Sequence, residues 1–156
     1  MNPDELDDTD RKVLSDISQY GLHIVHIIGE EELPPFSFSI GLFENYSHPE
    51  IIIIGLVQEL THSLINDIAH DIKKGKKFEA LNYYPDILEG FDCYFIEVDI
   101  ANYREYLGYA NWYYNGDSFP AVQCIYPTTK GIYPWQEEWP DNIKGLQPIL
   151  GKIIGN

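Results

Sequence analysis

A histidine and a glutamate flank a single proline in the sequence Tyr46-Ser47-His48-Pro49-Glu50. Proline fixes its own backbone torsion, so this turn holds His48 and Glu50 at the mouth of two expected strands. An imidazole and a carboxylate placed there could act as a general base and its orienting group, or as two metal ligands. The same side chains could equally satisfy backbone groups of the turn, and both interpretations stay open.

No metal site is predicted from the histidine spacing. The chain has no His-Glu-x-x-His or Cys-x-x-Cys sequence, which are the strongest zinc signatures. His62, Asn66 and His70 share one face of an expected helix, but this face lies opposite the leucine stripe and should be solvated. His23 and His26 fall on opposite faces of an expected strand and therefore cannot chelate together. We expect no metal ion and no cofactor.

Nucleophilic catalysis has no signature in the chain either. Gly-x-Ser-x-Gly and a glycine-rich phosphate loop are both absent from the sequence. Cys93 and Cys124 are isolated thiols within apolar stretches that resemble strands. We expect both to be buried as small hydrophobic side chains, although a disulfide between them is geometrically feasible.

Aromatic residues are abundant, with 12 Tyr, 7 Phe and 3 Trp. Most of them should lie in the core or at its margin, since Tyr and Trp combine apolar area with one polar group. Trp135 and Trp139 lie between prolines and acidic residues. They are the candidates for an exposed contact surface.

The charge balance excludes several function classes. Ten Lys and Arg stand against 25 Asp and Glu, which gives a formal net charge of −15. A general nucleic-acid binder is excluded because few cations are available to replace phosphate counterions. Binding to an anionic membrane is disfavoured for the same reason. Four of the lysines surround the end of one expected helix, namely Lys73, Lys74, Lys76 and Lys77.

The hydrophobic pattern predicts a single α+β domain over residues 1–156. Apolar residues at helical spacing indicate about three helices, over residues 7–20, 57–74 and 103–114. Alternating or continuous β-branched residues indicate strands over residues 22–28, 36–42, 51–54, 91–100 and 120–126. Residues 82–90 are expected to be a loop. The sheet should be mainly antiparallel, with the strand at 51–54 in its centre, followed by an irregular C-terminal wrap rich in proline and tryptophan.

The N-terminus predicts a cytoplasmic protein. It is acidic where a signal peptide would be basic and then apolar. The longest apolar run, residues 51–57, is far shorter than the ~20 residues that cross a bilayer.

Several of these segments together resemble a bacterial family catalogued as domain of unknown function forty-two sixty-two. The first half of the resemblance is carried by Gly21–Val25, Phe36–Leu42, His48-Pro49-Glu50 and Gly55-Leu56, and the second by Val122-Gln123, Tyr126-Pro127, Gly131–Trp135 and Gln147–Leu150. The chain departs from the family pattern at Leu22 and Thr128. The resemblance implies a small cytoplasmic domain without a known activity. It also implies that His48, Glu50, Gln123 and Trp135 meet at one edge of the sheet.

Three functions from different classes follow. The first is a non-catalytic acidic module that binds a basic protein, such as an immunity-type inhibitor that neutralises a cationic toxin, with His48, Glu50, Gln123, Trp135 and Trp139 as binding candidates. The alternative is a small-molecule-binding or hydrolytic domain that uses the His48-Pro49-Glu50 turn. In the third, the negative charge serves only solubility.

Overall fold

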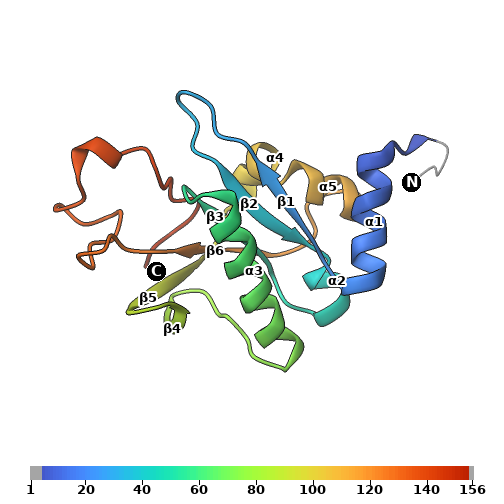
Figure 1. The fold of residues 1–156 in the computed structure, drawn as a ribbon, viewed down its shortest axis with the longest axis horizontal. Coiled ribbons are helices and arrows are strands. Elements are labelled where there is room, and N and C mark those ends of the chain that lie inside the picture. The colour runs from blue at the N-terminus through green and yellow to red at the C-terminus, as the bar shows by residue number, and fades with distance from the viewer. Residues whose placement is uncertain (1–4, 155–156) are drawn as a thin grey trace.

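A six-stranded sheet forms the centre of the molecule (Figure 1). The computed structural model describes residues 5–154. In spatial order the strands are β1 (His23–Ile27), β2 (Phe36–Ile40), β3 (Glu50–Ile54), β6 (Ala121–Ile125), β5 (Phe91–Glu97) and β4 (Asn82–Leu88). Every neighbouring pair is antiparallel except β3 and β6, which are parallel. The predicted α+β class with a mainly antiparallel sheet is confirmed.

Residues 5–154 contain five α-helices, where the sequence predicted about three. They are α1 (Asp8–Tyr20), α2 (Leu42–Tyr46), α3 (Gln58–Lys73), α4 (Tyr103–Tyr106) and α5 (Gly108–Tyr114). The short α2 begins on the last residue of the strand predicted over 36–42 and lies before the strand predicted over 51–54. The helix predicted over residues 103–114 is interrupted at Leu107. The backbone of this residue is not helical (φ −121°, ψ 30°), and its side chain is fully buried.

The sheet buries both of its faces, so each strand near the centre is apolar on both sides. All five residues of β3 and of β6 are buried. On one face, α3 packs its Leu64, Ile65 and Ile68 against the sheet, as its apolar spacing predicted. On the other face, α1, α4 and α5 cover the half of the sheet that contains β2 and β3.

The C-terminal wrap, residues 127–154, covers the remaining part of that second face and contains no strand or α-helix (Figure 1). Its aromatic and aliphatic side chains pack on Tyr94, Ile96 and Ile125 of β5 and β6. The predicted irregular wrap is therefore an ordered part of the core.

The expected loop at residues 82–90 is wrong, because the structure forms β4 there. Pro85 and Gly90 favour a loop in the sequence, and proline in particular cannot donate a ladder hydrogen bond. Proline is tolerated at position 85 because β4 is an edge strand and because its pairing with β5 is irregular between Tyr84 and Leu88.

Candidate functional site

His48 is buried, with 3% of its surface exposed, and both of its ring nitrogens have partners. Nδ1 lies 2.8 Å from the carbonyl oxygen of Pro49, and the backbone N–H of Phe78 donates to Nε2 over 2.9 Å. A carbonyl can only accept and an N–H can only donate, so His48 is the neutral tautomer with its proton on Nδ1. Its imidazole thus attaches the segment after α3 to the start of β3.

The surroundings of His48 favour this neutral form. Burial lowers the pKa of His48, the hydrogen bond to Pro49 raises it, and the nearby Lys77 ammonium lowers it further. A second proton would sit on Nε2 and face the N–H of Phe78, which would break that hydrogen bond. Neither nitrogen is free to act as a general base in this arrangement.

Glu50 is completely buried at the start of β3 and accepts hydrogen bonds from five donors. The donors are the Ser39 hydroxyl (2.7 Å), the backbone N–H groups of Gly41 (3.0 Å), Leu42 (3.2 Å) and Phe43 (3.2 Å), and the Tyr114 hydroxyl. Helix α2 begins here with Gly41, which has no side chain to cap it, so the Glu50 carboxylate satisfies the first N–H groups of the helix.

Two opposing effects act on the Glu50 carboxyl. Burial raises its pKa, whereas the hydrogen bonds from Tyr114, Ser39 and the backbone lower it. Burial is the larger effect, so the pKa of Glu50 is raised overall. Three of the five donors are backbone N–H groups, which can only donate, so the carboxyl oxygens serve as their acceptors. Glu50 therefore has a structural role, joining β3, α2 and α5.

Gln123 is buried on β6 and attaches the C-terminal wrap to the sheet. Its Nε2 donates to the carbonyl of Pro148 over 2.7 Å, and its Oε1 accepts from the backbone N–H of Leu150 over 2.9 Å. Gln147 makes a similar pair with Tyr126, through the backbone N–H (3.0 Å) and the carbonyl (2.9 Å). Each amide bonds to the backbone through both its oxygen and its nitrogen.

The two candidate tryptophans lie in the wrap and are half-buried. Trp135 stacks on Tyr133, with ring centroids 5.1 Å apart, and meets Tyr94 edge-on at 5.3 Å. The indole N–H of Trp139 donates to the carbonyl of Ile143 over 3.1 Å. Their contacts are with the wrap and β5.

The structure does not bring the four residues of the resemblance together. Within residues 5–154, no hydrogen bond or ring contact joins any two of His48, Glu50, Gln123 and Trp135. The expected meeting at one sheet edge is therefore wrong. The motif positions are used separately, to close the β3 turn, to cap α2 and to hold the wrap.

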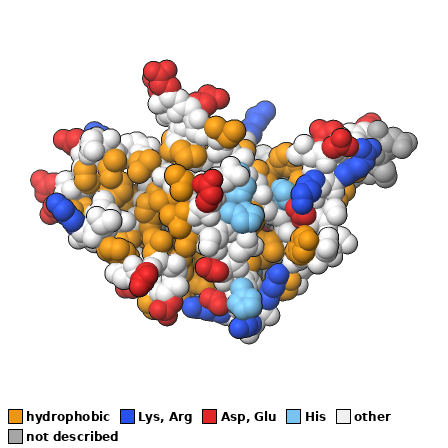
Figure 2. All heavy atoms as spheres, viewed as in Figure 1, with side chains coloured by type: hydrophobic (Ala, Val, Ile, Leu, Met, Phe, Trp, Pro, Cys, Tyr) orange, Lys and Arg blue, Asp and Glu red, His pale blue; other side chains and the backbone are white. Residues whose placement is uncertain are grey.

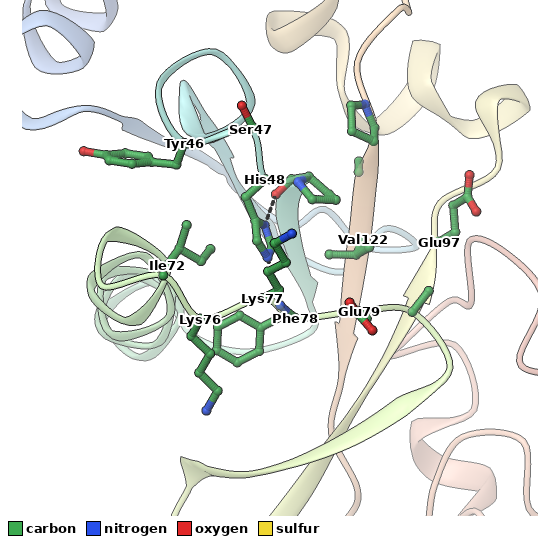
Figure 3. Close-up of a pocket in the computed structure, with 15 residues that line it drawn as sticks. Tyr46, Ser47, His48, Ile72, Lys76, Lys77, Phe78, Glu79, Glu97 and Val122 are labelled. Atoms are coloured by element: carbon green, nitrogen blue, oxygen red, sulfur yellow. Dashed lines mark hydrogen bonds between the residues drawn. The ribbon is translucent and has the colours of Figure 1, made fainter.

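A cavity of about 430 Å³ opens beside the His48-Pro49 turn, and we call it the His48 pocket (Figure 3). Four segments enclose it: the turn at Tyr46–Pro49, the end of α3 at Ile72, the following segment 75–80, and the sheet at residues 120–122 and 97, where β6 starts and β5 ends. Apolar lining comes from Phe78 and Val122 among others. Its volume lies within the range of ligand sites.

Charged side chains of both signs stand around the His48 pocket. Figure 3 shows Lys76 on one side and Glu97 on the other, with Lys77 and Glu79 between them. The Lys76 ammonium lies over the Phe78 ring at 4.9 Å. Among the described residues, no ion pair involves any of these four side chains, so their charges are available to a ligand.

The sequence reasoning found the turn but missed the pocket beside it, and it missed a contact between two histidines. His26 on β1 and His62 on α3 meet with 3.1 Å between Nε2 and Nδ1. The sequence had compared His26 only with His23, because nothing in the chain shows that α3 packs beside β1. The predicted burial of Cys93 and Cys124 as free thiols is confirmed.

The described residues offer neither a cluster of three metal ligands nor a membrane-spanning helix. Within residues 5–154, no three His, Cys, Asp or Glu side chains are grouped so that they could hold a metal ion. No helix in the same range has the length and apolar character that crossing a bilayer requires.

Comparison with known proteins identifies a family. No curated protein matches the chain. No solved structure matches it either. A family profile described as "Domain of unknown function (DUF4262)" matches residues 16–140, a range that extends from α1 into the C-terminal wrap and includes β1 to β6. The chain therefore belongs to the DUF4262 family.

Proposed function

We propose that this chain binds a small molecule in the His48 pocket and does not use His48 or Glu50 as catalytic groups. The observation that carries the proposal is a cavity of ligand size, about 430 Å³, enclosed by segments that are distant in sequence and joined by a buried histidine. An open cavity forgoes the packing contacts that a filled interior would make. The hydrogen bond between Phe78 and His48 keeps one wall of this cavity in place.

The charges around the pocket favour a particular kind of ligand. Lys76 and Lys77 would attract an anionic group, and Glu79 and Glu97 a cationic one, while Phe78 and Val122 contact an apolar body. A compact molecule with separated charges of opposite sign, such as an amino acid, meets all three requirements. A singly charged molecule leaves one pair of side chains without a partner.

The hydrolytic alternative is not supported by the same geometry. A general base needs a free lone pair within reach of a substrate proton, and the lone pair of His48 Nε2 is occupied by the N–H of Phe78. Glu50 lies at full burial with five donors and faces α2 and α5. We therefore propose binding without chemistry at this turn.

The test is to fill the pocket with a side chain. In Ala80→Trp, an indole from the half-buried pocket wall occupies the cavity, whereas Ala101→Trp places the same indole at an exposed position outside it. A library of amino acids and singly charged analogues is screened by ligand-detected NMR. Binding that is present in the wild type and in Ala101→Trp but lost in Ala80→Trp supports the proposal. Equal binding by all three proteins contradicts it.

A second candidate function is the binding of a basic protein, and the β1–β2 hairpin favours it. Glu30 and Leu33 pair through two backbone hydrogen bonds (2.8 and 3.1 Å), which puts Glu31 and Glu32 at the tip. The hairpin projects from the molecule, and acidic side chains lie at its tip (Figures 1 and 2). Ile28 and Leu33 beside them are 84% and 52% exposed, so apolar area adjoins the negative charge.

For this candidate we propose an immunity-type inhibitor in the bacterial cytoplasm, whose partner is a cationic toxin domain. The net charge of −15 would speed association with such a partner, and the hairpin would supply the contact. The partner to use is a toxin domain encoded beside this gene in its host. Its association rate should fall about tenfold for Glu31→Lys/Glu32→Lys and far less for the matched pair Glu137→Lys/Glu138→Lys on the wrap. Equal rates for the two double variants would contradict a contact through the hairpin.

A further inference from the structure

The contact between His26 and His62 lies on the surface, away from the His48 pocket. His26 is half-buried on β1, and His62 is exposed on α3. Figure 2 shows histidine side chains reaching the surface on the face that α3 covers. The two rings have centroids 5.3 Å apart and an interplanar angle of 37°.

A chain of hydrogen bonds links this pair to Ser37 on β2 and Thr61 on α3. The Thr61 hydroxyl lies 3.1 Å from the carbonyl oxygen of Gln58 and 2.8 Å from the Ser37 hydroxyl, and when it donates to that carbonyl its oxygen accepts from Ser37. Ser37 in turn accepts from Nδ1 of His26 at 2.7 Å. In this arrangement His26 carries its proton on Nδ1 and directs the lone pair of Nε2 toward His62.

This arrangement is the one that prepares a histidine to bind a metal. Metal-bound histidines usually donate their second N–H to an oxygen, which fixes the ring and makes the free nitrogen a better ligand. Ser37 supplies that oxygen for His26. Two nitrogens bound to one ion at about 2.0–2.1 Å stand roughly 3 Å apart at angles near 90–100°. The separation of His26 Nε2 and His62 Nδ1 is 3.1 Å.

We propose that His26 and His62 form a two-histidine site for a divalent transition-metal ion that prefers imidazole, such as Cu²⁺ or Zn²⁺. His62 would move its proton from Nδ1 to the exposed Nε2, and the rings would turn so that the lone pairs of His26 Nε2 and His62 Nδ1, which face each other in the hydrogen bond, converge on the ion. Water completes the coordination. Glu59 lies one turn before His62 on α3 and is close enough to favour positive charge at His26.

The experiment titrates Cu²⁺ into the full chain, with calorimetry for affinity and electron paramagnetic resonance for the number of bound nitrogens. The proposal expects one site with two imidazole nitrogens in the wild type. His62→Gln should weaken binding at least tenfold and leave one nitrogen. His70→Gln removes another exposed histidine of α3 and should change neither quantity. Mg²⁺, which prefers oxygen ligands, should not compete.

The hydrogen bond between His26 and Ser37 can be tested separately from the two metal ligands. Ser37→Ala keeps both ligands but removes the acceptor that holds His26 Nδ1, so Cu²⁺ should bind about tenfold more weakly while the two-nitrogen spectrum is retained. Circular dichroism confirms the fold of each variant. Equal affinities of wild type and His62→Gln, or a one-nitrogen spectrum in the wild type, would mean an adventitious ion at a single histidine and would overturn the proposal.

Discussion

Glu50 and His48 both bond to backbone groups that the secondary structure leaves free. Glu50 receives the first N–H groups of α2, and His48 receives the N–H of Phe78. Buried backbone donors without a partner are costly, so a polar side chain at each place stabilises the fold. The sequence singled out these residues as candidates and left a structural role open. It could not decide between the roles, because the partners of Glu50 on α2 and α5 and of His48 on Phe78 are set by packing.

Glu50→Gln should lower the free energy of unfolding by about 3 kcal/mol, measured by urea denaturation. The reason is that an amide replaces one acceptor oxygen by an NH₂ group, which would face at least one backbone N–H at either oxygen position. Tyr114→Phe removes a single donor and should cost less. Glu89→Gln, at an exposed turn, is the matched control. If Glu50→Gln proved as stable as this control, the carboxylate would not be what caps α2.

His48 should make the fold less stable in mild acid. Its pKa is lowered by burial in the folded protein, so the unfolded chain, with the ordinary value of 6.5, binds the proton more readily. The free energy of unfolding therefore keeps its full value above about pH 6.5. It decreases as the pH drops below that value, by at most about 1.4 kcal/mol per pH unit.

The measurement is the difference in unfolding free energy between pH 7 and pH 5 for the wild type and His48→Asn. The asparagine side chain does not titrate, so the variant should lose less stability across this interval. His26, whose pKa is also lowered by burial, is present in both proteins and cancels in the comparison. A His48 pKa of 6.5 or above in an NMR titration would contradict the assignment.

At the scale of elements, prediction succeeded where a segment carries its own pattern. The four isoleucines at 51–54 indicated a central strand, and the leucine and isoleucine spacing of α3 indicated its buried face. Prediction from the sequence failed where contacts with other parts of the fold override the local pattern. Pro85 is tolerated because β4 is at the edge of the sheet, and α2 forms because Glu50 caps it from a neighbouring strand.

The C-terminal wrap should depend on Gln123. In Gln123→Leu, the carbonyl of Pro148 and the N–H of Leu150 lose their partner, at a cost of about 2 kcal/mol. Hydrogen exchange should accelerate at the Leu150 amide and its neighbours in the wrap, while the β2 and β3 amides stay protected. Gln58→Leu, at an exposed position on α3, is the control. Unchanged exchange at Leu150 would show that the wrap is held by its apolar contacts alone.

For the whole molecule, the parallel pair β3–β6 joins two antiparallel halves, and the His48 pocket opens where these two strands begin. Its lining comes from residues 46–49, 72, 75–80, 97 and 120–122, which no local pattern connects. The fold class could therefore be read from the sequence, but the pocket could not. The net charge of −15 is a property of the whole sequence, and the pocket still gathers two of the ten basic residues.

A two-dimensional ¹H–¹⁵N NMR titration of the wild-type chain with an amino-acid library tests ligand binding in the His48 pocket most directly. The amide of Phe78 is the key reporter, because it bonds to His48 Nε2 in the pocket wall. We expect saturable shift changes at Lys77, Phe78 and Val122, with the amides of the β1–β2 hairpin unmoved. A titration in which no amide around the pocket shifts, or in which the shifts gather at the hairpin instead, would contradict the account.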